Sequence, residues 1–211
     1  MFSFAKQINE GNNSFSGSTV KLMGNVDLNN AAWTPIGQTG ATEFKGVFDG
    51  RGNTIYNLNI DSSANTDGHY SSGLFGWIED HGNGIVVKNL IVDGATVKGN
   101  HNVAVIVGYS YGGDVINCHV KNANILCTHA NDDACGDKCG IIGGYVADES
   151  KIIDCRAQDS TVKAGRDAGQ LIGCGYTSSI SGCSAENVTV NANGDCTGAN
   201  INNDLIGRVM N

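Results

Sequence analysis

A short apolar pattern recurs along this chain. Two adjacent aliphatic or aromatic residues are followed by a glycine, at intervals of 30 to 35 residues. The five copies are Gly73-Leu-Phe-Gly76, Val105-Ile-Val-Gly108, Gly140-Ile-Ile-Gly143, Gln170-Leu-Ile-Gly173 and Asp204-Leu-Ile-Gly207. Self-similarity at this period is typical of repeat architectures, in which each unit stacks on its neighbours. The pattern therefore predicts a solenoid.

Alternating apolar and polar positions surround each copy and predict short strands with one face directed inward. The predicted first strands are 55–60, 87–92, 115–120, 152–157 and 180–185. Second strands follow at 95–99, 123–127, 160–164 and 188–192. The recurring apolar-apolar-glycine element supplies the third strand, with its glycine in a tight position where that strand ends.

Three short strands in each repeat cannot enclose a core alone, but stacked coils form three parallel sheets around a shared interior. Crossovers between parallel strands are overwhelmingly right-handed. We therefore predict an all-β fold, a right-handed parallel β-helix of about five coils with three strands each. The chain is expected to be one domain, 1–211, with an N-terminal cap and first coil over 1–54 and repeated coils over 55–211. Leucine-rich repeats fit less well, because the repeats contain no helical segment.

The two ends of the predicted solenoid differ. Residues 3–10 have Phe4 and Ile8 on one helical face and Gly11 as a stop signal, which predicts a short helix lying over the first coil. The last coil has no capping sequence, and its unpaired strand edges favour association. Leu205, Ile206 and Val209 are the candidate residues for such an assembly end.

Three segments together resemble a known family. They are Asp27-Leu with Trp33-Thr-Pro-Ile-Gly37, then 44–58 (FKGVFDGRGNTIYNL), then Gly73-Leu-Phe-Gly76. This combination is similar to the GLUG-motif β-helix modules of bacterial surface proteins, and the similarity spans nearly the whole chain. It implies a parallel β-helix that accompanies adhesins and surface peptidases without being the catalytic part.

Composition narrows the possible partners. The net charge of −8 argues against nucleic acid and anionic membranes, which are bound by clustered Lys and Arg. No apolar run approaches the roughly 18 to 20 residues of a membrane span. No signal peptide precedes Phe2, so the chain is either cytosolic or a mature or excised piece. Together with the family resemblance, we expect an extracellular or cell-surface location.

The eight cysteines divide into two groups. Cys118, Cys155 and Cys183 take the inward position that Leu58 and Leu90 hold in earlier repeats, and Cys127 is also expected in the core, because reduced cysteine packs as a small hydrophobe. Cys135, Cys139 and Cys196 lie in the inserts or at their ends, and Cys174 follows the repeat glycine. A loop disulfide of Cys135 with Cys139 or Cys196 and free thiols both remain open. A metal site formed by Cys127, His129, Cys135 and Cys139 is disfavoured, because their spacing matches no compact metal-binding pair.

Aromatic and acidic residues follow the repeat glycine and predict a column along one corner. The aromatic residues are Trp77, Tyr109, Tyr111, Tyr145 and Tyr176, and the acidic ones are Glu79, Asp80, Asp114, Asp148 and Glu149. The column is either a sugar-binding strip, with rings that stack on pyranoses, or a packed corner with solubilising charges. Neighbouring acids satisfy the spacing for glycoside hydrolysis too easily to indicate catalysis. No catalytic residue is predicted.

The Asp/Asn-rich segments 61–67 and 129–137 lack EF-hand spacing, so no cofactor is predicted and Ca²⁺ is only the weaker alternative. We therefore expect a non-catalytic extracellular or cell-surface scaffold or adhesion module. Its expected partners are other protein chains, copies of itself or surface glycans. The first alternative is a structural subunit that assembles end to end through its last coil. The second is a carbohydrate-binding or carbohydrate-active protein.

Overall fold

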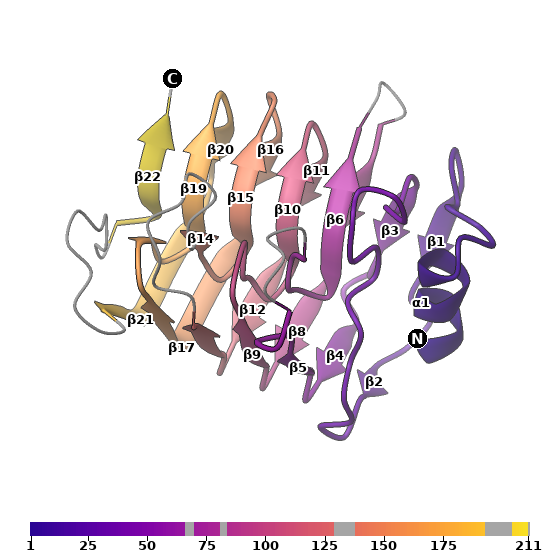
Figure 1. Cartoon of the computed structure of the whole chain (residues 1–211), viewed down its shortest axis with the longest axis horizontal. Helices are drawn as coiled ribbons and strands as arrows, with labels where there is room; N and C mark the ends of the chain where they lie inside the picture. Colours follow the sequence, from indigo (N-terminus) through magenta and orange to yellow (C-terminus); the bar gives the residue numbers. More distant parts are fainter. Residues whose placement is uncertain (66–69, 81–83, 129–137, 193–203, 211) are drawn as a thin grey trace.

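The computed structural model describes residues 1–65, 70–80, 84–128, 138–192 and 204–210. Three stacks of parallel strands run along the length of the molecule (Figure 1). Within the described residues every strand pair is parallel. The fold is thus the predicted parallel β-helix; the handedness of its coil stays a prediction.

We name the three stacks sheets A, B and C. Sheet A contains, in order, β1 (Thr19–Lys21), β3 (Val47–Asp49), β7 (Val86–Lys88), β11 (Asp114–Ile116), β16 (Lys151–Ile153) and β20 (Ser179–Ser181). Sheet C contains β6 (Phe75–Glu79), β10 (Val107–Tyr111), β15 (Gly143–Ala147), β19 (Ile172–Tyr176) and β22 (Ile206–Met210).

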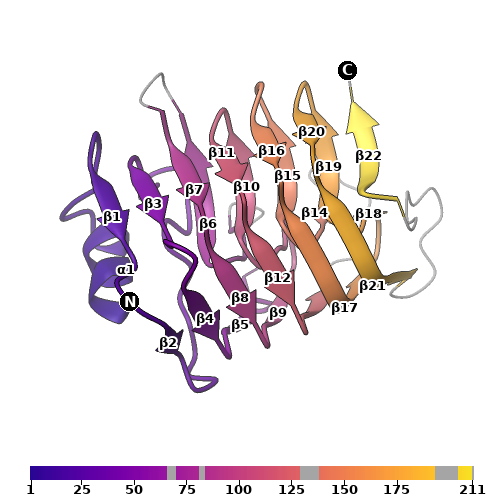
Figure 2. The same ribbon diagram turned by 180° about the vertical axis from the view of Figure 1, so that it is seen from behind.

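Sheet B is wider because each coil contributes to it twice (Figure 2). One series contains β2 (Val26–Asp27), β4 (Thr54–Tyr56), β8 (Ile91–Asp93) and β12 (His119–Lys121). The other contains β5 (Asn59–Asp61), β9 (Thr96–Gly99) and β13 (Asn124–Cys127). The long strands β17 (Arg156–Ala164) and β21 (Ser184–Ala192) span both series. A small separate sheet pairs β14 (Lys138–Cys139) with β18 (Asp167–Ala168).

The predicted six-residue first strands are wrong in detail, because each is two strands separated by a turn. The turn residue has a positive φ in all five copies: Asn57 (57°), Asn89 (53°), Asn117 (51°), Asp154 (52°) and Gly182 (64°). Asn, Asp and Gly tolerate this left-handed conformation better than other residues. The turn residues also connect neighbouring coils by hydrogen bonds. The Asn89 amide donates to Asp49 Oδ1 at 3.0 Å, and the Asn117 amide donates to Asn89 Oδ1 at 2.9 Å.

The predicted register of the first repeat is also wrong. Ile55 pairs with Val92 rather than Val87, whose partner is Phe48. Leu58 consequently does not share the cysteine position. Its carbonyl accepts the N–H of Thr96, whereas the Leu90 carbonyl accepts the N–H of His119, which follows Cys118. The prediction holds for Leu90, which, like Cys118, Cys127 and Cys155, is buried in the core, whereas Cys183 is only partly buried and packs against it.

The repeat glycine lies near the start of the third strand, not at its end as predicted. Gly108 is the second residue of β10, and in the next coil the equivalent residue is Gly144 rather than Gly143, because Val107 pairs with Gly143. A Cβ on Gly108 would lie 2.6 Å from the carbonyl oxygen of Asn102. Glycine is therefore needed because the returning insert passes directly over the strand.

The predicted helix is present as α1 (Phe2–Asn9) and covers the first coil (Figure 1). Ala5 and Ile8 are buried, and the Phe4 ring lies 5.9 Å from Phe48. This is the only helix among the described residues, and it is too short to cross a membrane.

At the opposite end, β20, β21 and β22 each have a partner strand on one side only, as far as the described residues show. Leu205 and Ile206 pack partly against the core, while Val209 is 66% exposed.

Candidate functional site

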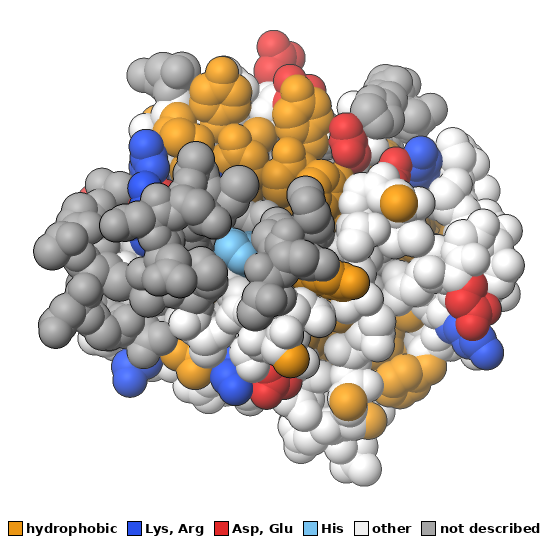
Figure 3. Space-filling model, viewed as in Figure 1, with side chains coloured by type: hydrophobic (Ala, Val, Ile, Leu, Met, Phe, Trp, Pro, Cys, Tyr) orange, Lys and Arg blue, Asp and Glu red, His pale blue; other side chains and the backbone are white. Residues whose placement is uncertain are grey.

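The outer face of sheet C carries two parallel columns of side chains, one residue from each coil. The first, which we call the packed column, contains the paired residues Trp77, Tyr109, Tyr145, Cys174 and Arg208. The second, which we call the exposed column, lies two residues further along each strand and contains Glu79, Tyr111, Ala147, Tyr176 and Met210. Figure 3 shows hydrophobic side chains gathered over sheet C, with acidic side chains beside them.

The rings of the packed column stack on one another. The centroids of Trp77 and Tyr109 are 3.8 Å apart with planes inclined by 22°, and those of Tyr109 and Tyr145 are 5.3 Å apart. Gly40 lies against the indole, since a Cβ there would be 3.5 Å from Trp77 Cε2. At the other end, Lys138 Nζ lies 4.9 Å from the Tyr145 centroid. The ring faces of this column are thus occupied by protein atoms.

A cluster of charged residues follows the last ring. Lys138 and Asp167 are paired across β14 and β18, and Arg208 Nη1 lies 3.4 Å from Asp167 Oδ2. Asp167 is only 2% exposed, so its buried carboxylate depends on the ion pair with Arg208 for its charge. Burial, followed by the charge of Asp167, raises the pKa of the Cys174 thiol to about 11. This thiol is therefore a packing group and a poor nucleophile.

The exposed column presents its two tyrosines to solvent. Tyr111 is 36% and Tyr176 40% exposed. The negative charge of Asp148 is the first cause of the raised pKa of Tyr111. Glu79 accepts a hydrogen bond from Trp77 Nε1 at 3.1 Å. Two carboxylates therefore border the exposed tyrosines.

Two further predicted acids, Asp80 and Asp114, have local structural contacts. Asp80 accepts hydrogen bonds from the N–H of Gly84, at 3.2 and 3.1 Å to its two oxygens. Asp114 Oδ1 accepts the N–H of Lys151 at 2.9 Å and links two coils. The structure thus brings the five predicted aromatic residues onto one face and places Glu79 and Asp148 beside an exposed ring.

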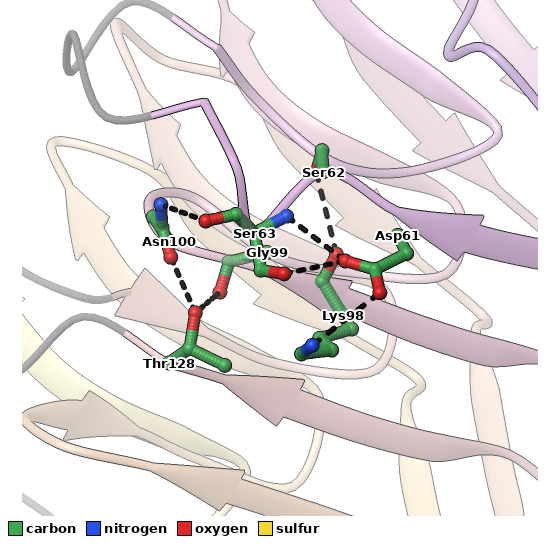
Figure 4. Close-up of polar contacts among 7 residues, drawn as sticks. All are labelled: Asp61, Ser62, Ser63, Lys98, Gly99, Asn100 and Thr128. Carbon is green, nitrogen blue, oxygen red and sulfur yellow. Dashed lines mark hydrogen bonds and ion pairs between the residues drawn. The ribbon is translucent and has the colours of Figure 1, made fainter.

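A polar cluster at the base of the inserts was not predicted from the sequence (Figure 4). Asp61 Oδ1 accepts the N–H of Ser63 at 3.1 Å, and Asp61 Oδ2 lies 3.3 Å from Lys98 Nζ. The Asn100 amide donates to the carbonyl of Ser63 at 2.8 Å, and Thr128 donates to the carbonyl of Gly99 at 3.2 Å. The hydrogen bond from Ser63 is the first cause of the lowered pKa of Asp61. These contacts fix the inserts to sheet B.

The two candidate metal sites lie partly outside the described residues, which leave out Asp67 and the segment 129–137. In the described part of the chain, no group of three His, Cys, Asp or Glu side chains is arranged to hold a metal ion. Asp61 is instead paired with Lys98, and the buried Cys127 donates its thiol hydrogen to the carbonyl of Asn100 at 3.1 Å. Cys135 and Cys196, the candidates for a loop disulfide, also lie outside the described residues.

Comparison with known proteins supports the fold and finds a relative whose sequence matches part of this chain. No family model matches the chain, so the GLUG resemblance stays a prediction. Halomucin from Haloquadratum walsbyi is 28% identical over 141 residues, which cover 63% of this chain and 1% of halomucin. The crystal structure of a candidate immunoglobulin A1 protease from Bacteroides ovatus matches with a TM-score of 0.58 and 19% identity, covering 92% of this chain and 57% of the other. At that identity the structural match shows a shared fold.

Proposed function

We propose that this chain is a non-catalytic module of a cell-surface or extracellular protein and acts in adhesion through sheet C. The exposed column carries the proposal, because it holds two solvent-facing tyrosines bordered by Glu79 and Asp148. The similarity to halomucin, by its name a mucin, supports a surface or extracellular location. The protease name of the structural neighbour belongs to that protein and is not transferred at 19% identity.

A surface glycan is the ligand that fits this column best. The face of a tyrosine ring packs on the apolar face of a pyranose, and carboxylates accept hydrogen bonds from its hydroxyl groups. Tyr111 and Tyr176 belong to coils separated by one intervening coil, so their backbones are about 10 Å apart. Two sugars of one chain would therefore contact Tyr111 and Tyr176.

The test is a glycan array probed with the wild-type chain, with Tyr111→Ala and with Tyr176→Ala. We expect each variant to lose about five- to thirtyfold in affinity, because stacking on an aromatic ring contributes on the order of 1 to 2 kcal/mol. Met23→Ala is the matched control, since Met23 is 76% exposed and lies outside sheet C. Glycan binding that survives both tyrosine substitutions would contradict the proposal.

End-to-end assembly is a second candidate, supported by the last described coil. The free edges of β20, β21 and β22 can accept a further parallel strand each, and the exposed Val209 lies on β22. A contact of this kind repeats without closing and produces filaments.

Light scattering at increasing protein concentration tests this candidate. We expect polymers that disappear in Val209→Lys, because a charge at the contact must be desolvated. Met23→Lys is the control for added charge away from this end. A monodisperse wild-type protein at high concentration would exclude assembly.

A further inference from the structure

A groove lies on the outer surface at the corner where sheet A passes into sheet B. Its volume is about 520 Å³, within the range of about 300 to 1,000 Å³ that is typical of small-molecule sites. Three successive coils line it with the side chains of Asn89, Ile91, Asn117, His119, Asp154 and Arg156. Both sheets continue beyond these coils in each direction, so the groove lies away from the ends of the solenoid.

A ladder of hydrogen bonds between turn side chains stops inside this groove. The Asn117 amide donates to Asn89 Oδ1 at 2.9 Å, and the Asn89 amide donates to Asp49 Oδ1 at 3.0 Å. The residue at this turn in the next coil is Asp154, whose carboxylate has no hydrogen to donate. The Asn117 side-chain oxygen and the Asp154 carboxylate are therefore two acceptors, one coil apart, that cannot pair with each other.

Two side chains with nitrogen donors line the same groove from sheet B. His119 is paired with Arg156 across β12 and β17, so the two residues stand one strand spacing apart. Partial burial, followed by the charges of Lys121 and Arg156, lowers the pKa of His119, so its ring is neutral at neutral pH. The cation of the groove is therefore the exposed guanidinium of Arg156.

The polar groups of this groove differ from those beside it on sheet B. Lys121 Nζ lies 3.2 Å from Asp93 Oδ2, so these two charges balance each other. Within the part of the chain that the structure describes, the side chains of His119, Asp154 and Arg156 form no hydrogen bond and no ion pair. A concave surface thus combines one guanidinium, one neutral imidazole and two oxygen acceptors that have no protein partner.

We propose that this groove binds a sugar that carries a carboxylate, such as a glucuronic acid unit of an acidic saccharide. The guanidinium of Arg156 can donate two parallel hydrogen bonds to the sugar carboxylate. Asn117 and Asp154 accept hydrogen bonds from sugar hydroxyls, and Ile91 offers an apolar contact to the C–H face of the ring. A simple anion fits less well, because it would face the Asp154 carboxylate without offering it a hydrogen. The site is separate from the exposed column, which lies on sheet C.

The test is an NMR titration of the ¹⁵N-labelled full chain with methyl β-glucuronide, with methyl β-glucoside as the neutral control ligand. We expect saturable shifts of the backbone amides of 117–119 and 154–156 with the glucuronide. The glucoside should bind at least about tenfold more weakly, because hydrogen bonds between charged partners are the stronger ones. Equal affinity for the two sugars, or shifts confined to sheet C, would overturn the proposal. Tighter binding of glycine than of the glucuronide would also overturn it, since the site would then recognise a zwitterion.

Two variants separate this groove from general electrostatics. Arg156→Met should weaken glucuronide binding by at least about tenfold and leave glucoside binding nearly unchanged. Its side chain is exposed, so the variant should keep the amide spectrum of the folded chain. Lys163→Met is the matched control, because it removes one positive charge from the same strand outside the groove. Equal losses in Arg156→Met and Lys163→Met would show that only the net charge matters, and the proposed site would be wrong.

Tyr111→Ala distinguishes this site from the proposed glycan column. The variant should bind the glucuronide with wild-type affinity, because Tyr111 lies on sheet C. Loss of glucuronide binding in Tyr111→Ala but not in Arg156→Met would place the sugar on sheet C and exclude the groove.

Discussion

The packed and exposed columns of sheet C stand on the same strands, two residues apart, yet their tyrosines are used differently. Tyr109 lies between Trp77 and Tyr145, so both of its faces are covered by rings. Tyr111 is paired with Ala147 in the next coil, and no ring occupies that position. Whether an aromatic residue of this solenoid is packed or faces solvent therefore depends on the residue at the paired position in the next coil.

This contrast refines the predicted sugar-binding strip. Trp77, Tyr109 and Tyr145 hold adjacent coils together, which leaves their edges rather than their faces toward solvent. Tyr111 and Tyr176 are the members available to a ligand. Stability and binding should consequently respond to different substitutions on one face of the molecule.

Gly108→Ala should have the largest effect, because both columns depend on the path of β10. The added Cβ would lie 2.6 Å from the carbonyl oxygen of Asn102, so the insert or the strand must move. We expect a loss of about 3 kcal/mol in the free energy of unfolding, measured by urea denaturation. Gly24→Ala is the control, since a Cβ there meets no atom within 4 Å. Equal stability of the two variants would show that the close approach is unimportant.

Trp77→Ala should show that the packed column contributes more to the stability of the fold than the exposed column does. The substitution removes a ring held between Gly40 and Tyr109, and we expect a loss of about 2 kcal/mol in the free energy of unfolding. Tyr111→Ala should cost less than about 0.5 kcal/mol, because its side chain is exposed. Urea denaturation of both variants measures the difference. If Tyr111→Ala were the more destabilising, the assignment of the two columns would be reversed.

The sequence predicted the solenoid because its period and alternation are properties of every coil. It also contained the signal for the turns, since Asn57, Asn89, Asn117, Asp154 and Gly182 all belong to residue types that tolerate positive φ. That signal was missed because the surrounding alternation continues through the turn. The first repeat was placed out of register because Phe48 and Ile55 enclose a longer turn than their counterparts Val87 and Val92.

The candidate site was predictable only in part. The recurrence of aromatic residues after the repeat glycine placed all five on sheet C. Which ring faces remain free depends on Gly40 and Lys138, which approach the column from outside sheet C. Such contacts have no local sequence pattern, so the division into two columns required the structure.

Lys138→Met should have a smaller effect at the end of the packed column. The change removes the cation over Tyr145, on a strand that pairs with the one carrying the buried Asp167. We expect a loss of about 1 kcal/mol in the free energy of unfolding, measured in urea at low salt. Lys163→Met, on the exposed side of β17, is the control and should be neutral. Equal losses in the two variants would show that the ring contact contributes nothing.

Tyr109→Phe should have the smallest effect on the free energy of unfolding at neutral pH. Its effect should be measurable only at alkaline pH. Burial raises the pKa of Tyr109 to about 12, whereas a tyrosine in the unfolded chain ionises near pH 10. Above about pH 10 the unfolded state loses a proton that the folded state retains, so stability falls as the pH rises toward 12. Phenylalanine keeps the stacked ring and removes this proton, and the variant should therefore lose less stability over that interval. Urea denaturation in a pH series measures the slope, and an unchanged slope in Tyr109→Phe would mean that another group causes the alkaline loss.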